Sequence, residues 1–384
     1  MSSFDRGDHE FRGLMGSAPQ QMLADLRERA PKIYDAIITG FRETIGQPEL
    51  SRYSRELATV AMLAALGGAE PQLTLHTQAA LRNGVEPDEL IALCEHIYPY
   101  AGMPRALNAL TVIDKVLTDA GHPRPAPLKT VQLGDHETVV AQRGDTGTAV
   151  LLVHAISLDW RMWEPVMNEL GKSRRVFAYD LRGHGRAMGA PAATSMNEYT
   201  SDLVGVLDAL DLDRAHVVGL SFGGGVAQAA AVTHPERFAS LSLLATGDTP
   251  NDEVFENRAV AGETEGMAAQ IVPSLTRWFT PAALAANGWG VKYARERMLR
   301  ANPADWAATW RAFKTLDVHG KLGTFESPVL VVAGEADLSA TPASMREIAG
   351  RIPGSRFEEL PGTPHMLSLE QPALVAETLG RFIP

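Results

Sequence analysis

The first third of the chain carries apolar residues at helical spacing. In one stretch they recur at intervals of three and four, at Leu57, Val60, Ala61, Leu63 and Ala64. Such spacing places the apolar side chains on one face of an α-helix. A second stripe ends at Asn83-Gly84, which favours a helix C-cap, and Pro87 and Pro104 suit the first turns of two further helices. No alternating strand pattern occurs between residues 20 and 120, so we expect this region to be entirely helical.

The pattern changes after residue 122. Residues 122–128 contain three alternating prolines, and such a stretch makes a stiff, extended connector. Residues 130–142, broken at Gly134-Asp135, predict a β-hairpin. Short apolar runs then alternate with helical stretches, and the runs lie at 150–153, 176–179, 217–220, 241–244 and 329–332. This alternation is typical of a parallel sheet with helices on both faces.

The two patterns predict two domains. We expect an all-α domain over residues 1–122, a Pro-rich linker over 123–128 and an α/β domain over 129–384. A helical, tryptophan-containing segment from about residue 250 to 322 interrupts the α/β pattern. Because ligands bind at the carboxyl ends of the strands in open α/β sheets, we expect this insertion to form a lid over that edge.

The composition narrows the classes of function. The chain has 384 residues and a net charge of −11, which argues against binding to nucleic acid or to an anionic membrane. Its one cysteine, Cys94, excludes an internal disulfide and a CxxC redox or zinc site, and we expect it to be a small core residue. The N-terminal segment lacks the apolar core of a signal peptide, and no apolar stretch is long enough to span a bilayer. We therefore expect a cytoplasmic protein.

One short motif indicates nucleophilic catalysis. Gly219-Leu-Ser221-Phe-Gly223 follows an apolar run and precedes a run of small residues from Gly224 to Ala231. This arrangement predicts a strand, a sharp turn and a helix with a serine at the turn, as in the nucleophile elbow of serine hydrolases. The neighbouring glycines relieve crowding around such a turn. We predict that Ser221 is the catalytic nucleophile.

The acid and the base of a catalytic triad are expected later in the chain. Asp337 stands just past a buried apolar strand, where its carboxylate can orient an imidazole. Glu335 on the same turn and Asp248 after an earlier strand are the alternatives. His365 lies on a turn after the final predicted strand and is the expected base. The order Ser221, Asp337, His365 is found in one fold of serine hydrolases and differs from the two other known orders.

A serine nucleophile also needs backbone donors for the oxyanion. We expect one to be the N–H of Phe222, directly after the serine, and the other to be the N–H of Ile156, in the loop after an earlier strand. His154 is expected to be a packed turn residue rather than a second base. Arg182 and His184 belong to a glycine-containing turn, and we expect them to stabilise the fold rather than to bind a ligand.

Further segments of the second domain extend this pattern: Trp160-Arg-Met-Trp163, Asp180-Leu-Arg-Gly-His-Gly185, Arg258 through Gly266-Met267, Arg277-Trp278-Phe279-Thr280 and Glu370-Gln-Pro372. With the triad, they make residues 129–384 resemble the α/β-hydrolase family and, within it, the 3-oxoadipate enol-lactonases. The resemblance implies a serine hydrolase that opens a small lactone. We expect a nearby cation, Arg161 or Arg277, to bind the substrate carboxylate, and we expect Trp163 and Trp278 to line the substrate site. Ala155 departs from the family, which usually has glycine there, and its methyl would alter the oxyanion loop or narrow the pocket.

The helical region carries a pattern that spans the whole domain, at Ser54-Arg-Glu-Leu57, Leu75 to Val85, Pro87-Asp-Glu-Leu90, Tyr100 to Arg105 and Asn108-Ala-Leu110. On these segments, residues 50–117 resemble the carboxymuconolactone decarboxylase family. The resemblance implies decarboxylation of a lactone without metal or cofactor, which requires a pocket for the carboxylate and a proton donor. Peroxidases of this superfamily use a CxxC pair, which this chain lacks, so we do not expect a thiol peroxidase.

Four side chains are candidates for the decarboxylase chemistry. His76, Glu56 and Glu95 are the predicted catalytic residues, and His96 is a further candidate. Adjacent helical residues point about 100° apart, so Glu95 and His96 need not share one site. The alternatives are that His76 is a satisfied core histidine and that Glu56 forms an ion pair with Arg55.

The two resemblances together imply a bifunctional enzyme without a metal or cofactor. The helical domain would convert 4-carboxymuconolactone to 3-oxoadipate enol-lactone, and the hydrolase domain would open that lactone to 3-oxoadipate. One alternative is a hydrolase of another lactone or ester whose helical domain acts only in oligomerisation. Another is a peroxide-dependent oxidant of the same fold. Relatives of the helical domain form rings, so we expect a homo-oligomer that binds a small-molecule lactone and neither nucleic acid nor membrane.

Overall fold

The computed structural model describes residues 3–16, 20–121 and 126–384. The chain divides into two compact units, Met1–Pro125 and Ala126–Pro384, and each has its own hydrophobic core. Residues 123–125 of the predicted linker lie outside the described residues. Its last residue, Leu128, already belongs to the first strand.

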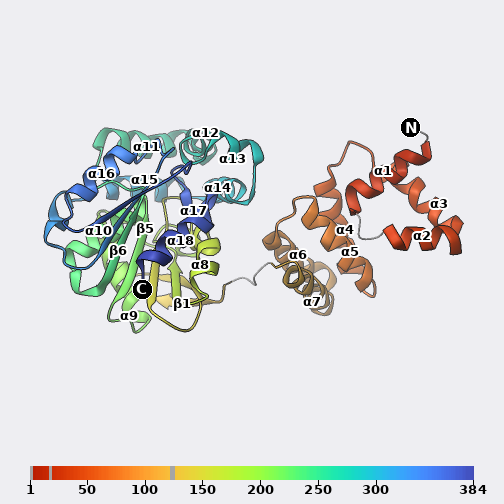
Figure 1. Cartoon of the computed structure of the whole chain (residues 1–384), viewed down its shortest axis with the longest axis horizontal. Helices are drawn as coiled ribbons and strands as arrows, with labels where there is room; N and C mark the ends of the chain where they lie inside the picture. The colour runs from red at the N-terminus through yellow and green to blue at the C-terminus, as the bar shows by residue number, and fades with distance from the viewer. Residues whose placement is uncertain (1–2, 17–19, 122–125) are drawn as a thin grey trace. The chain divides into compact units, whose positions relative to one another are not determined.

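The first unit is helical, as the sequence predicts (Figure 1). Its elements are α1 Ser3–Met15, α2 Gln20–Arg29, α3 Pro31–Gly40, the π-helix η1 Phe41–Ile45, α4 Arg52–Leu66, α5 Glu70–Arg82, α6 Pro87–Ala101 and α7 Met103–Asp119. Side chains cap the starts of α4 and α6. Ser51 Oγ accepts a hydrogen bond from the N–H of Ser54 at the start of α4, and a capping box joins Glu86 and Glu89 at the start of α6.

The helical unit contains two small cores. Helices α4 to α7 bury one around Val60 and Ile113. Helices α1 to α3 and η1 bury the other around Phe11 and Ile38, and this core also includes Ala79 of α5. The N-terminal helices therefore pack on the rest of the unit, although the apolar pattern indicated helices only from residue 20 onward.

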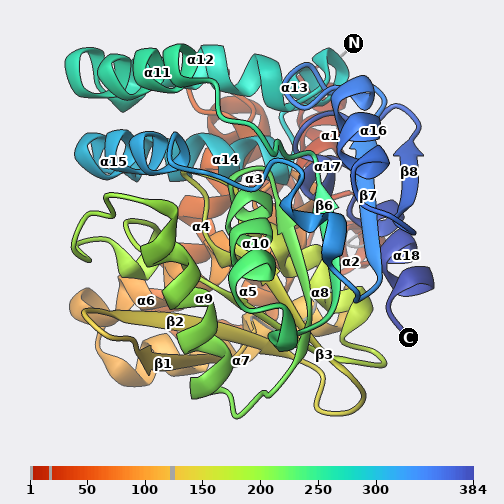
Figure 2. The ribbon, with the colours of Figure 1, turned by 90° about the vertical axis from the view of Figure 1, so that its left-hand side faces the viewer.

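The second unit is built on an eight-stranded sheet (Figure 2). Its strands are β1 Leu128–Gln132, β2 Glu137–Arg143, β3 Ala149–Val153, β4 Arg175–Tyr179, β5 Ala215–Leu220, β6 Phe238–Leu244, β7 Val329–Gly334 and β8 Arg356–Leu360. They lie in the order β1-β2-β4-β3-β5-β6-β7-β8. Strand β2 pairs antiparallel with β1 and β4, and the other pairings are parallel. The carboxyl ends of β3 to β8 therefore meet at one edge of the sheet.

Helices cover both faces of this sheet. They are α8 Glu164–Leu170, α9 Met196–Ala209, α10 Phe222–Thr233, α16 Pro342–Gly350, α17 Leu367–Glu370 and α18 Pro372–Phe382, with 3-10 turns η2 Trp160–Trp163, η3 Gly185–Ala187, η4 Pro235–Arg237 and η5 Lys321–Thr324. Figure 2 shows α9 and α10 in front of the sheet and α8 behind it. Strands β3, β5 and β7 are buried at every residue, which explains their continuous apolar sequences.

The predicted lid is a layer of five helices between β6 and β7. They are α11 Asp252–Glu265, α12 Met267–Trp278, α13 Pro281–Ala286, α14 Trp289–Arg300 and α15 Pro303–Phe313. They form the upper layer of this unit in Figures 1 and 2. Side chains from α11, α12 and α15 line a cavity together with residues at the carboxyl ends of β5 and β6.

Two surface properties bear on the predicted partners. No helix in the described ranges has the length and the apolar character needed to cross a membrane. In the helical unit, Met62, Leu66 and Tyr100 are apolar and exposed. The expected self-association through this unit stays a prediction.

Candidate active site

Ser221 occupies a sharp turn between β5 and α10. Its backbone has φ 54° and ψ −116°, which a residue with a side chain adopts only under constraint. The turn also requires its two glycines. A Cβ on Gly219 would lie 2.3 Å from the carbonyl oxygen of Gly223, and a Cβ on Gly223 would lie 2.3 Å from the carbonyl oxygen of Val153. The Gly-x-Ser-x-Gly spacing therefore reflects the close approach of two strands and a helix around a strained serine.

Ser221, His365 and Asp337 form a hydrogen-bonded relay. His365 Nε2 lies 3.0 Å from Ser221 Oγ, and His365 Nδ1 lies 2.8 Å from Asp337 Oδ2. The other oxygen of Asp337 accepts hydrogen bonds from the N–H groups of Ser339 and Ala340, which orient the carboxylate. In this geometry the imidazole can accept the serine proton while the carboxylate stabilises the imidazolium.

The two alternative acids are engaged elsewhere. Asp248 Oδ2 lies 2.8 Å from Nη2 and 2.9 Å from Nε of Arg351. Glu335 Oε2 accepts a hydrogen bond of 2.8 Å from the N–H of Gly362. Of the three carboxylates, the structure places that of Asp337 against His365.

Two backbone N–H groups near Ser221 are available as oxyanion donors. Phe222 is the first residue of α10, and Ile156 lines the same cavity as Ser221. Within the described ranges neither N–H donates a hydrogen bond, and for Phe222 this is expected of the first residue of a helix. The left-handed residue of the oxyanion loop is Ser157, with φ 63°. Ala155 is buried outside the cavity lining, so the expectation that its methyl narrows the pocket is wrong.

Ser221 faces a cavity of about 450 Å³ beneath the lid. Arg258 of α11 and Arg277 of α12 both line it, together with Trp278. The guanidinium carbon of Arg258 lies 4.7 Å from the centre of the Trp310 ring, and Arg277 Nη2 makes a 3.4 Å hydrogen bond to the hydroxyl of Ser274. Among the described residues, neither guanidinium has a carboxylate partner.

The two unpaired cations determine which ligand suits the cavity. Burial lowers the pKa of Arg258, and the charge of Arg277 lowers it further, to about 10. Burial also lowers the pKa of Arg277. A carboxylate would relieve this repulsion and accept charge-assisted hydrogen bonds. Arg258 was not among the predicted site residues, because the family resemblance of its segment did not indicate that α11 and α12 meet over the serine.

Other predicted substrate contacts lie elsewhere. Trp163 is fully buried in the core and lies outside the cavity lining. Arg161 is also outside that lining, and its Nη1 lies 3.8 Å from Asp159 Oδ2. The prediction that these two side chains contact substrate is therefore wrong, because η2 directs one into the core and the other towards a carboxylate. The ring of Phe222 is buried as well, so only its backbone can serve the site.

In the helical unit, His76 of α5 and Glu56 of α4 form an interhelical pair. His76 Nδ1 lies 2.9 Å from Glu56 Oε2. The side chain of Glu56 is 1% exposed, whereas that of His76 is 22% exposed. A buried carboxylate therefore orients an imidazole that still reaches solvent. Arg55 instead donates to the carbonyls of Leu50 and Gln47, so the alternative ion pair between Arg55 and Glu56 is wrong.

The remaining candidates of the helical unit lie apart from this pair. Glu95 and His96 are exposed on α6, and in the described chain no hydrogen bond joins either of them to His76 or Glu56. The ring of His96 instead lies 5.3 Å from that of Tyr100. The structure therefore does not bring Glu95 into a common site with the pair. Cys94 is buried, as predicted.

Comparison with protein families also divides the chain into a helical part and a hydrolase part. Residues 148–372, more than half of the chain, match the model of the alpha/beta hydrolase fold. The chain belongs to this family. Residues 31–115 match the carboxymuconolactone decarboxylase family. This match begins before residue 50, where the predicted resemblance began, so α3 is part of the decarboxylase-family domain.

Individual relatives narrow the type of hydrolase. The 3-oxoadipate enol-lactonase 1 of Acinetobacter baylyi is 26% identical over 240 residues, which cover 62% of this chain and 90% of that protein. The crystal structure of the enol-lactonase from Burkholderia xenovorans LB400 is 29% identical with a TM-score of 0.64, covering 66% of this chain and 99% of that one. A thermophilic esterase from Thermogutta terrifontis is 28% identical with a TM-score of 0.63, covering 67% and 98%. The chain thus joins a decarboxylase-family helical domain to an enol-lactonase-like hydrolase domain.

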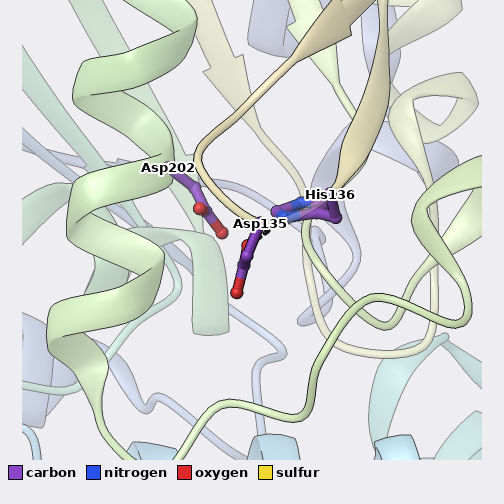
Figure 3. Close-up of side chains that lie close together, drawn as sticks. All are labelled: Asp135, His136 and Asp202. Atoms are coloured by element: carbon purple, nitrogen blue, oxygen red, sulfur yellow. Dashed lines mark hydrogen bonds and ion pairs between the residues drawn. The ribbon is translucent and has the colours of Figure 1, made fainter.

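The hydrolase domain also contains a side-chain cluster with metal-ligand spacing. Asp135, His136 and Asp202 offer ligand atoms within 4.8 Å of one another (Figure 3). However, Arg182 Nε and Nη2 lie 2.6 and 2.7 Å from the two oxygens of Asp202, and Nη1 and Nη2 each lie 3.2 Å from an oxygen of Asp135. The guanidinium already supplies the positive charge that a cation would bring. We therefore assign this cluster a structural role, which agrees with Arg182 as a scaffold residue.

Two buried histidines of the hydrolase domain make its stability depend on pH. Burial lowers the pKa of His154 to about 3 and that of His184 to about 4. Both side chains are neutral in the folded state at pH 5, whereas in the unfolded state they bind protons below about pH 6.5. The unfolded state then holds more protons, so the free energy of unfolding falls as the pH decreases from about 6.5 towards 4.

We predict that this proton uptake costs about 2 kcal/mol of stability per histidine between pH 7.5 and pH 5. Burial also raises the pKa of Asp180, to about 7, and this group makes the free energy of unfolding change with pH in the opposite direction. The effect of one histidine is therefore measured by comparing variants. His184→Asn is expected to weaken the pH dependence of the urea midpoint. Equal slopes in the wild type and His184→Asn would contradict this account.

Proposed function

We propose that this protein is a bifunctional enzyme that decarboxylates 4-carboxymuconolactone and then hydrolyses the resulting 3-oxoadipate enol-lactone to 3-oxoadipate. The observation that carries the proposal is the cavity that Ser221 and His365 of the Ser221–His365–Asp337 relay line together with Arg258 and Arg277. The relay supports acyl transfer, and the arginines support a small substrate with a carboxylate. The enol-lactone has both an activated ester bond and a carboxylate.

The hydrolytic step follows from the geometry of the relay. Ser221 Oγ attacks the lactone carbonyl, and His365 Nε2 takes the serine proton. The N–H groups of Phe222 and Ile156 stabilise the negative charge on the carbonyl oxygen. The ring C–O bond breaks, the imidazolium of His365 gives up its proton, and the leaving enolate takes up a proton at carbon and becomes a ketone. A water that His365 deprotonates then attacks the acyl-enzyme, and 3-oxoadipate leaves.

The decarboxylation is assigned to the pair of His76 and Glu56. When carbon dioxide leaves, the electron pair of the broken C–C bond enters the conjugated lactone. A proton donor must then neutralise the carbanion at the allylic carbon. His76 is the proposed donor, because Glu56 orients its ring through Nδ1 and its side chain reaches solvent. The two reactions are consecutive, since the product of the first is the substrate of the second.

The direct test is to supply 4-carboxymuconolactone to the full-length protein. We expect the lactone to be consumed and 3-oxoadipate and carbon dioxide to appear in equal amounts, followed by NMR and gas analysis. If the protein leaves 4-carboxymuconolactone unchanged but hydrolyses enol-lactone supplied directly, the decarboxylase assignment fails. If it hydrolyses only neutral esters, the enol-lactonase assignment fails too.

Removing either cavity arginine is expected to reduce kcat/KM for the enol-lactone about 10- to 100-fold, because a hydrogen bond to a charged group contributes about 1.5–3 kcal/mol. The variants are Arg258→Gln and Arg277→Gln, measured separately. Hydrolysis of p-nitrophenyl acetate provides the matched control, since this ester carries no carboxylate. An equal loss on both substrates would indicate a damaged site rather than a lost carboxylate contact.

A further inference from the structure

A buried carboxylate connects the oxyanion loop to the lid. Asp159 follows Ile156 in the loop after β3 and is 2% exposed. Its Oδ2 lies 2.8 Å from Nη1 of Arg297, and its Oδ1 accepts a hydrogen bond of 2.8 Å from the hydroxyl of Tyr293. The oxygen of the same hydroxyl accepts a hydrogen bond of 3.1 Å from the backbone N–H of Asp159. Tyr293 and Arg297 both lie on α14. This one lid helix therefore holds both the backbone and the side chain of Asp159 in the loop.

The charges at this point favour a fixed arrangement. Burial alone would raise the pKa of the Asp159 carboxyl, but Arg161 and Arg297 hold it below its usual value. Asp159 also accepts a hydrogen bond from the N–H of Arg161 through Oδ1, which caps η2. A buried carboxylate with this many donors resists displacement, because each lost partner would leave a charge unpaired away from water.

The same lid helix packs against the chain that follows His365. A Cβ on Gly290 of α14 would lie 2.8 Å from the carbonyl oxygen of Leu369, which belongs to α17. One helix turn from Gly290, the ring of Tyr293 stacks on that of Trp289 with centroids 5.1 Å apart. A neighbouring lid residue also contributes, since the carbonyl of Trp278 accepts a hydrogen bond of 3.0 Å from the N–H of Met366. The lid therefore contacts both loops that complete the relay around Ser221.

We propose that Tyr293 and Arg297 are positioning residues that set the oxyanion donor of Ile156 by holding Asp159 against α14. This inference rests on the proposed hydrolysis at Ser221. It assigns α14 a role in catalysis that is separate from covering the substrate. Because Tyr293 and Arg297 do not line the cavity, their loss should change the rate of the chemical step more than the binding of substrate.

The test compares four variants of the full-length protein on 3-oxoadipate enol-lactone and on p-nitrophenyl acetate. Arg297→Met removes the ion pair, and Tyr293→Phe removes only the hydroxyl while keeping the stacked ring. Arg297→Lys keeps a cation, and Arg300→Met is the control on the same helix, where the arginine is 66% exposed and pairs with Glu296. Thermal unfolding of each variant reports whether the domain is folded at the assay temperature.

We expect Arg297→Met and Tyr293→Phe to lower kcat about 10- to 100-fold on both substrates with KM changed less than about threefold, as for a misplaced oxyanion donor. Arg297→Lys should recover part of the loss, and Arg300→Met should match the wild type. The inference is overturned if folded Arg297→Met and Tyr293→Phe keep the wild-type kcat, or if KM alone changes. If the wild type hydrolyses neither substrate, the proposed function itself fails, which is a distinct result.

Discussion

Ser221→Ala is expected to convert 4-carboxymuconolactone only as far as 3-oxoadipate enol-lactone, which then accumulates, while the wild type continues to 3-oxoadipate. The alanine removes the nucleophile that lies 3.0 Å from His365 Nε2 and leaves the helical domain untouched. Loss of a triad member lowers kcat by about 10⁴-fold or more, so hydrolysis should fall to the uncatalysed background of this labile lactone. The accumulating lactone can be followed by NMR, and enol-lactone supplied directly should persist with the variant.

A matched control is Ser242→Ala. Ser242 is a buried serine on the neighbouring strand β6, and its hydroxyl has no hydrogen-bond partner among the described residues. This replacement removes the same atom from the same sheet without touching the relay, so 3-oxoadipate should form at close to the wild-type rate. If Ser221→Ala still forms 3-oxoadipate at the wild-type rate, then Ser221 is not the nucleophile and the assignment of the relay fails.

Glu56→Gln is expected to slow decarboxylation strongly while lactone hydrolysis continues. Glutamine has nearly the shape of glutamate but carries no negative charge, so the ring of His76 loses the carboxylate that lies 2.9 Å from its Nδ1. A positioned general acid contributes about 10²- to 10⁴-fold, and the consumption of 4-carboxymuconolactone should slow by a factor in that range. Hydrolysis of enol-lactone supplied directly measures the second domain in the same sample.

The control for this variant is Glu95→Gln. Glu95 was an equal candidate in the sequence, but it is exposed on α6 and does not contact the pair. Its replacement should leave both activities unchanged. If Glu95→Gln stops decarboxylation and Glu56→Gln does not, then the catalytic group lies on α6 and the role given to His76 is wrong. Circular dichroism of the helical domain separates lost chemistry from lost folding.

Local patterns in the sequence were enough to predict the framework of the site. The glycines stand at fixed positions on either side of Ser221, so a short motif carries the information, although the close neighbour of Gly223 is Val153 of the distant strand β3. The buried strands are continuous apolar runs in the sequence, because helices cover both faces of a parallel sheet. The order of the candidate triad residues along the chain indicated one fold of hydrolase. Each of these features is visible as a short spacing, as the period of an element or as the order of residues along the chain.

The choice among chemically equal side chains depended on contacts between distant segments. Asp337, Asp248 and Glu335 all follow strands or their turns, and only the packing of the last loop places His365 against one of them. The orientation of η2 buries Trp163, although its sequence motif led us to expect a contact with substrate.

The sequence by itself therefore determined two domains, a nucleophile turn and the residue types of a triad. The tertiary structure decided that Arg258 and Arg277 share the cavity of Ser221, and that Glu56, not Glu95, orients His76. The physical reason is that a helix or strand period is set by local backbone geometry. The meeting of two side chains on different helices is set by how those helices pack, and no local pattern records it.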